Sequence, residues 1–119
     1  MNRRHLEALL GRILPLPTAP FHEYHVRKQI LAELEKIDGV SWKIDDYGNV
    51  IAQYKRGSKR AKYAFGAHMD HPGFVKNGKG DLEFLGGVPE ATVKNCRDQI
   101  VDHGDFAVWD VEDFALRDG

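Results

Sequence analysis

The stretch that decides the fold of this 119-residue chain is KYAFGAHMDHPGF, residues 62–74. It opens as a nearly continuous apolar run, which is typical of a strand buried on both faces of a sheet, so we expect a strand over residues 63–67. His68, Asp70 and His71 follow at its carboxyl end, where α/β proteins commonly place their functional sites. The pattern therefore predicts a buried strand that presents polar, metal-binding side chains where it ends.

His68 and Asp70 are the residue types of a metal ligand and its supporting group. A metal-binding imidazole generally needs its second ring nitrogen held in place, and a carboxylate is the usual partner. The same pair also fits a purely structural role, a strand-end histidine hydrogen-bonded to a neighbouring carboxylate. His71 could be a second ligand, a residue of a substrate cleft or simply an exposed side chain.

The residues before this stretch predict two helices. Leucine and isoleucine recur at helical spacing over residues 2–14, with Asn2 available as the N-cap, and prolines then end the helix. A second apolar stripe predicts a helix over residues 21–37, and Gly39 is suited to ending it. These helices supply apolar faces that can cover a sheet.

A β-hairpin is predicted between the second helix and the deciding stretch. Residues 40–45 alternate apolar with polar side chains, and residues 50–55 form the returning strand. Gly48 lies in the connecting turn, where it can supply the positive φ that a tight hairpin requires.

The character of the sequence changes after Val75. Glycine-rich turns separate short apolar segments, so we expect strands at 82–85, 91–95, 105–109 and 114–116, while residues 95–102 fit no single interpretation. We therefore expect an α/β fold in two parts: residues 1–75, with two helices packed on a mixed sheet, and residues 76–119, which are rich in β structure.

Composition excludes several classes of function. The chain carries 17 Lys and Arg against 18 Asp and Glu, and the basic residues are scattered, which argues against a nucleic-acid surface. No apolar run approaches the length of a membrane span. No signal-peptide pattern is present, and the single cysteine, Cys96, has no internal disulfide partner, so we expect a cytoplasmic setting and a packing role for that thiol.

Three motifs in order give a more specific indication. They are PTAPFHE at 17–23, DDYGNVIA at 45–52 and AHMDHPGF at 67–74. Their order and spacing resemble the amino-terminal part of the co-catalytic dinuclear-metal aminopeptidases, closest to the glutamyl-aminopeptidase and tetrahedral-aminopeptidase group. The resemblance covers residues 15 to 75.

The resemblance implies a function and roles for two residues. His68 would bind one of two zinc or cobalt ions, and Asp70 would orient its imidazole. The substrate would be a peptide with a free amino terminus, and His71, Phe74, Phe21 and His22 would lie near the cleft. The fold would be an incomplete α/β/α peptidase layer followed by the start of an inserted dimerisation domain, and the protein would form a homo-oligomer.

The chain departs from the family in its length. The other metal ligands and the general base of these enzymes match no residues here, so we expect the chain alone to be inactive. Without further strands to cover it, the third strand would also be exposed and would favour self-association. Two other classes therefore stay open: a non-catalytic interaction or assembly module built on the peptidase scaffold, and an unrelated α/β protein in which His68 and Asp70 are structural.

Overall fold

The computed structural model describes residues 2–57, 60, 63–89, 99–102 and 107–110. Internal contacts divide the chain into two compact units, Met1–Asp70 and His71–Gly119. The change in sequence character predicts this division at residue 75 instead. The difference arises because Gly73–Lys76 forms a strand that pairs with a later one and so belongs to the second unit.

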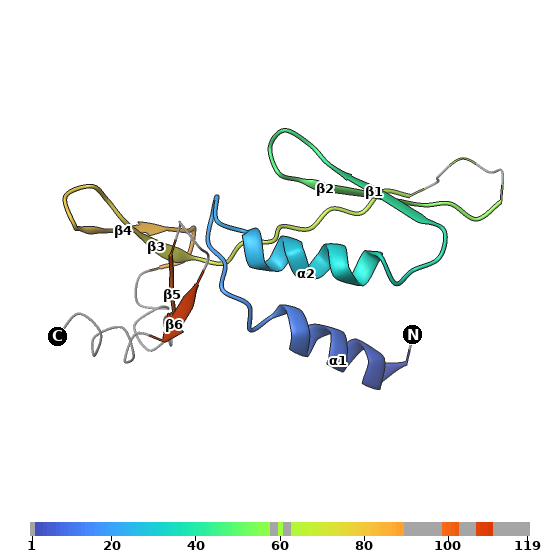
Figure 1. The fold of residues 1–119 in the computed structure, drawn as a ribbon, viewed down its shortest axis with the longest axis horizontal. Helices are drawn as coiled ribbons and strands as arrows, with labels where there is room; N and C mark the ends of the chain where they lie inside the picture. The colour runs from blue at the N-terminus through green and yellow to red at the C-terminus, as the bar shows by residue number, and fades with distance from the viewer. Residues whose placement is uncertain (1, 58–59, 61–62, 90–98, 103–106, 111–119) are drawn as a thin grey trace. The chain divides into compact units, whose positions relative to one another are not determined.

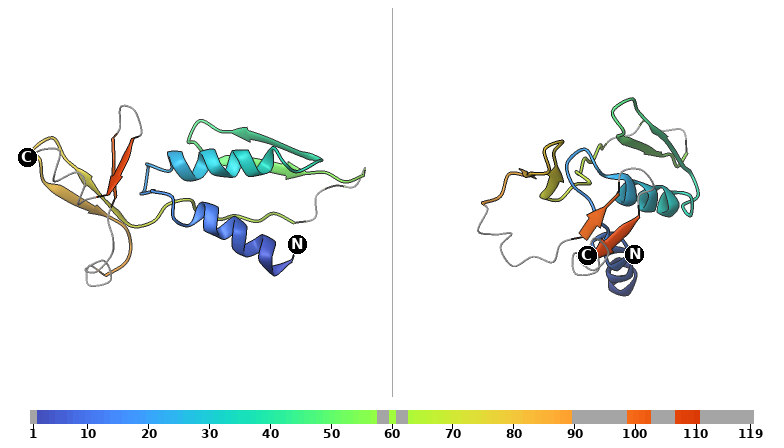
Figure 2. Two further views of the ribbon diagram at one scale, coloured as in Figure 1. Left: turned by 60° about the horizontal axis from the view of Figure 1, so that its bottom comes forward. Right: turned by 60° about the vertical axis from the view of Figure 1, so that its left-hand side comes forward.

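The first unit begins with two helices, α1 (Arg3–Ile13) and α2 (Tyr24–Leu34). The side chain of Asn2 accepts a hydrogen bond from the backbone N–H of His5 at 2.9 Å, so the predicted N-cap of α1 is confirmed. In Figures 1 and 2, α2 lies between α1 and the β-hairpin, and it contacts both.

Helix α2 is shorter at both ends than the predicted helix over residues 21–37. Phe21 has a φ of +68°, which no residue of a right-handed helix adopts, so the helix begins only after it. At the other end, the backbone N–H groups of Lys36 and Ile37 bond to carbonyls three residues back, which tightens the chain into turns before Gly39.

The hairpin consists of β1 (Val40–Ile44) and β2 (Val50–Tyr54), which pair in antiparallel fashion with Trp42 opposite Ala52. The predicted strands and turn are confirmed, and Gly48 has the expected positive φ, +85°. The carboxylate of Asp45 accepts hydrogen bonds from the backbone N–H groups of Tyr47 and Asn49 and from the Asn49 amide. These bonds lower the pKa of Asp45 and hold the turn in one conformation.

The predicted strand over residues 63–67 is wrong. These residues belong to no strand, and Tyr63 and Phe65 are 80% and 95% exposed. A buried strand needs a hydrogen-bonded neighbour, but β1 and β2 pair with each other and no described strand pairs with this segment. The expected mixed sheet is likewise not found in the described residues, whose sheets are all two-stranded and antiparallel.

The second unit contains two further antiparallel pairs. β3 (Gly73–Lys76) pairs with β4 (Leu82–Leu85), and the rings of Phe74 and Phe84 pack across the pair at a tilt, with their centroids 5.2 Å apart. β5 (Gln99–Val101) pairs with β6 (Val108–Asp110).

Of the strands predicted in the second unit, 82–85 is confirmed as β4, and 105–109 overlaps β6 in part. The predicted strands at 91–95 and 114–116, and the packing role of Cys96, fall outside the described residues. The mixed α/β class holds for the described chain, whose helices all lie in the first unit.

Candidate functional site

His68 and Asp70, which the sequence predicts as a metal ligand and its supporting group, are in contact. Nδ1 of His68 lies 2.9 Å from the main-chain oxygen of Asp70 and 3.1 Å from its carboxylate Oδ1. A main-chain carbonyl oxygen can only accept a hydrogen bond, so Nδ1 carries the proton and donates it. In the neutral imidazole, the lone pair then lies on Nε2, and with the side chain 82% exposed this nitrogen is accessible to a metal ion.

The backbone at this pair is anchored to the loop between α1 and α2. The hydroxyl of Thr18 donates a hydrogen bond to the main-chain oxygen of Met69 at 2.9 Å, across 51 positions of sequence. Met69 stands between His68 and Asp70, so this bond fixes the turn that brings the carboxyl group of Asp70 back onto the imidazole.

His68 and Asp70 border a small polar hollow of about 140 Å³. The β1–β2 turn contributes Tyr47, Gly48 and Asn49 to its wall, and Glu23 lines it from the start of α2. The carboxylate of Glu23 accepts a hydrogen bond from the backbone N–H of Phe21 at 2.9 Å. The three motifs quoted from the sequence therefore meet around one hollow.

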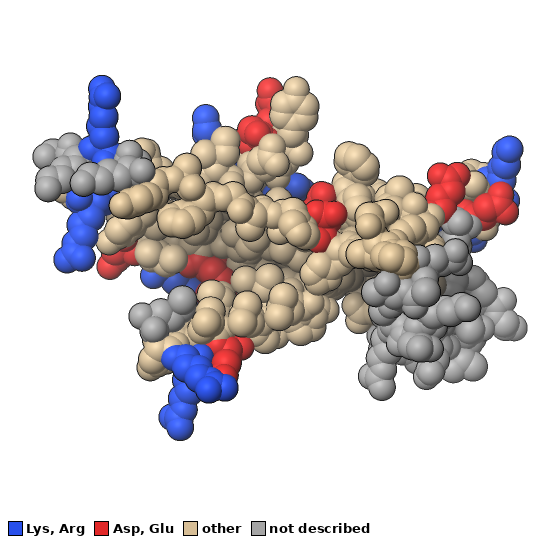
Figure 3. Space-filling model, turned by 180° about the vertical axis from the view of Figure 1, so that it is seen from behind, with Lys and Arg blue, Asp and Glu red and all other residues tan. Residues whose placement is uncertain are grey.

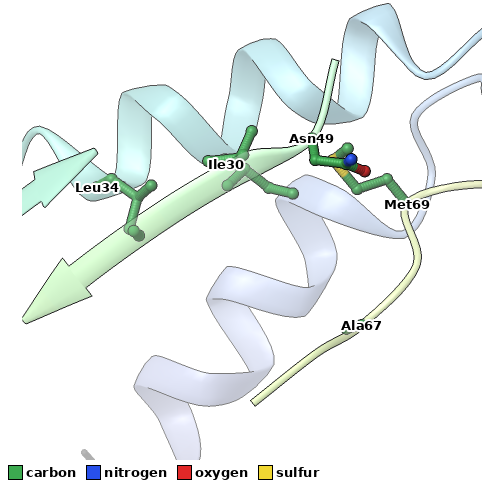
Figure 4. Close-up of a pocket in the computed structure, with 7 residues that line it drawn as sticks. Ile30, Leu34, Asn49, Ala67 and Met69 are labelled. Carbon is green, nitrogen blue, oxygen red and sulfur yellow. The ribbon is translucent and has the colours of Figure 1, made fainter. Parts of the chain in front are cut away.

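An apolar groove of about 200 Å³ lies next to this hollow and is shown in Figure 4. Ile30 and Leu34 contribute from α2, and Val50 and Ala52 from β2. Ala67 and Met69 line the groove from the unpaired segment, and Asn49 lies at the end shared with the polar hollow.

Four further residues were expected near the substrate cleft: Phe21, His22, His71 and Phe74. Phe21 is 87% exposed and does not line the hollow, while His22 and His25 are half-buried. The ring of His25 packs edge-on against that of Tyr24, with the ring centroids 5.2 Å apart. His71 and Phe74 belong to the second unit.

Sequence reasoning missed Glu23 and Asn49 as residues of the site. Both residues lie within the quoted motifs, at 17–23 and 45–52, but neither was predicted to have a role of its own. The available signal was the order of the three motifs, since each contributes to the wall of the same hollow.

The described residues do not complete a metal centre. Among them, no three His, Cys, Asp or Glu side chains are grouped so that they could hold a metal ion. A protein zinc site usually has three or four protein ligands, and the contact of His68 with Asp70 is compatible with only one of them. His68, with Asp70 as its supporting group, thus fits one ligand position of a zinc site.

Charges on the first unit are dispersed. On the face seen in Figure 3, its Lys and Arg side chains stand at separate places, with uncharged and acidic surface between them. In the part of the chain that the structure describes, no helix is long and apolar enough to cross a membrane.

The comparisons with known proteins assign no family. No protein-family model matches the sequence, and no solved structure matches the fold.

Proposed function

We propose that this chain carries one metal-ligand position of a metallo-aminopeptidase. The observation that supports the proposal is the contact of His68 Nδ1 with the main-chain oxygen and carboxylate of Asp70. This contact favours the tautomer that leaves Nε2 as an exposed donor atom for zinc or cobalt. In a complete two-metal site, such ions would polarise the carbonyl of the scissile peptide and activate water.

The roles of the residues follow from these contacts. His68 would bind one ion, and Asp70 would keep the imidazole in the binding tautomer. Thr18 would hold the turn through Met69. Because the described residues provide a single ligand position, the proposal requires further ligands and a general base from outside them, and we expect no peptide hydrolysis by this chain alone.

Metal titration followed by NMR of the histidine rings tests this proposal. We expect Zn²⁺ to shift the Nε2 resonance of His68, with weak affinity because one protein ligand is supplied. His68→Ala should abolish this response, and Asp70→Asn should weaken binding by about 10- to 100-fold, the usual effect of losing a supporting group.

His71→Ala is the matched control, since it removes a neighbouring imidazole from the second unit and should leave the His68 response intact. A response confined to other histidines, or one that survives His68→Ala, would overturn the assignment of His68 as the ligand.

A second candidate is a non-catalytic interaction module. The extended segment over residues 63–68 favours it, because this segment is exposed and belongs to no strand. Loss of the metal response in the titration above, together with retained self-association, would favour this candidate.

A further inference from the structure

We propose that Asn77 is a site of spontaneous deamidation, at which the turn between β3 and β4 promotes attack of the Gly78 main-chain nitrogen on the Asn77 side chain. The turn has the sequence NGKG, residues 77–80, and closes the β3–β4 hairpin seen in Figure 1. This inference concerns the second unit and does not depend on the metal site, so either proposal can fail without the other.

The reaction converts a carboxamide into a carboxylate by way of a cyclic imide. The nitrogen of Gly78 loses its proton to a solvent base and bonds to Cγ of Asn77, whose Oδ1 takes up the negative charge. The charge then returns to form the imide carbonyl, and Nδ2 leaves as ammonia with a proton from water. A water molecule opens the ring at either carbonyl and restores the proton on the nitrogen, which leaves an aspartate or an isoaspartate.

The attacking nitrogen is accessible. Gly78 is exposed, and its N–H donates no hydrogen bond to any of the described residues. A β-carbon built at Gly78 would meet no atom within 4 Å, so the space beside this residue is open. Glycine also has no side chain to obstruct the ring that forms, and its backbone adapts more readily than that of any other residue.

The carboxamide under attack is held and polarised by the turn. Oδ1 of Asn77 accepts hydrogen bonds from the backbone N–H groups of Lys79, at 2.9 Å, and Asp81, at 3.0 Å. These bonds fold the carboxamide back along the peptide that follows it, as in an Asx turn. They also aim two donors at the oxygen on which negative charge develops, and donors placed in this way stabilise the transition state. The folded turn should therefore react faster than the unfolded chain.

The modification would weaken the hairpin. Nδ2 of Asn77 donates a hydrogen bond to the carboxylate of Glu83 at 2.9 Å. Deamidation replaces this donor with a carboxylate oxygen, so two like charges meet where a hydrogen bond stood. Isoaspartate also lengthens the main chain by one carbon, between the N–H of residue 77 that bonds to Asp81 and the carbonyl of residue 77 that bonds to Gly80. Both changes disfavour the turn that closes the hairpin.

Peptide mapping by mass spectrometry after incubation at mildly alkaline pH is the first test. The folded chain should lose the Asn77 carboxamide severalfold faster than the same chain unfolded in urea, with aspartate and isoaspartate as products. Asn49 is the internal control, because the β-branched Val50 follows it and hinders ring closure, so its carboxamide should persist. Equal or slower reaction in the folded chain, or faster loss at Asn49, would overturn the proposal.

Gly78→Ala tests the identity of the attacking nitrogen. Gly78 does not have a positive φ and has open space beside it, so alanine should fit the turn. The added β-carbon crowds the nitrogen and stiffens the backbone, so the reaction in the folded chain should slow severalfold. Lys79→Ala is the matched control, because it keeps the backbone N–H that bonds to Oδ1 and should leave the rate unchanged. An unchanged rate in Gly78→Ala would contradict attack by this nitrogen.

Hydrogen exchange tests the effect of the modification on the hairpin. The backbone amides of β3 and β4 should exchange faster in Asn77→Asp than in the wild type, because the pair opens more often. Adding Glu83→Gln should slow the exchange again, since it removes one of the two like charges. Exchange in Asn77→Asp at the wild-type rate would contradict the predicted weakening.

Discussion

At the scale of single residues, Phe21 has a backbone conformation that its residue type disfavours. Its φ of +68° lies in the left-handed region, which costs most residues other than glycine about 1 kcal/mol or more. Its side chain is 87% exposed, so burial of the ring does not offset this cost. The conformation lets the N–H of Phe21 reach the carboxylate of Glu23 just before α2 begins.

We expect Phe21→Gly to stabilise the chain, by roughly 0.5–1 kcal/mol, because glycine adopts this conformation without strain. Thermal unfolding followed by circular dichroism measures the change. Tyr47→Gly is the control, since Tyr47 is an exposed aromatic residue without a positive φ. It should lower stability, and a similar loss in Phe21→Gly would show that the backbone at Phe21 is unstrained.

At the scale of elements, α1 is held to α2 by ionic hydrogen bonds. The guanidinium of Arg12 contacts both carboxylate oxygens of Glu33, at 2.8 and 3.2 Å, and Gln29 donates to the same carboxylate. Arg12, helped by Lys36 and Gln29, lowers the pKa of Glu33 to about 2. Charged hydrogen bonds in this fork geometry are among the stronger polar contacts in proteins.

The lowered pKa predicts how stability depends on pH. Glu33 takes up a proton more readily in the unfolded chain than in the folded one, so its contribution is complete above about pH 5 and is lost as pH falls toward 2. Unfolding midpoints at pH 6 and pH 3 should therefore differ less in Glu33→Gln than in the wild type.

The exposed pair Arg3–Glu7 provides the control, because its side chains are 91% and 58% exposed. Glu7→Gln should leave the pH dependence nearly unchanged. An equal change in both variants would show that Glu33 does not link the helices.

Local sequence signals predicted the elements whose causes are local. Asn2 capped α1, and Gly48 with Asp45 formed the hairpin turn, because each acts on residues only a few positions away. The strand predicted over residues 63–67 is wrong because its cause is not local. Its apolar residues match a buried strand, but a strand also requires a neighbour, and nothing within the segment reveals whether one is present.

In the candidate site, too, only the contacts between residues close in sequence were predictable. The contact of His68 with Asp70 lies within three residues and could be foreseen from spacing. The approach of Glu23 and Asn49 to the same hollow depends on how α2, the hairpin and the 67–70 segment pack. Their side chains carry no local sign of that packing.

At the scale of the whole chain, the described residues bury little apolar surface. Val26, 5% exposed, is the one buried hydrophobic residue among them, and fifteen large apolar side chains are more than a third exposed. Hydrophobic burial is the main favourable term in folding, so stability should be modest.

We expect a urea m-value at the low end of the range of about 1–3 kcal/mol/M for small proteins, since this slope scales with the surface exposed on unfolding. The chain should also bind a hydrophobic dye at neutral pH while keeping its secondary structure. Repeating the urea and dye measurements at several protein concentrations shows whether self-association covers part of this apolar surface. An m-value typical of a fully packed domain of this length would contradict the limited burial.

The hydrogen bond from Thr18 to Met69 also bears on the order of folding. Helices and a tight hairpin form from contacts close in sequence, whereas this bond joins residues 51 positions apart and needs the intervening elements in place first. We therefore expect the turn that presents His68 to be among the last parts of the first unit to assemble. We expect partial unfolding to release this turn early, so the ligand position proposed for His68 would form only after α1, α2 and the hairpin have come together.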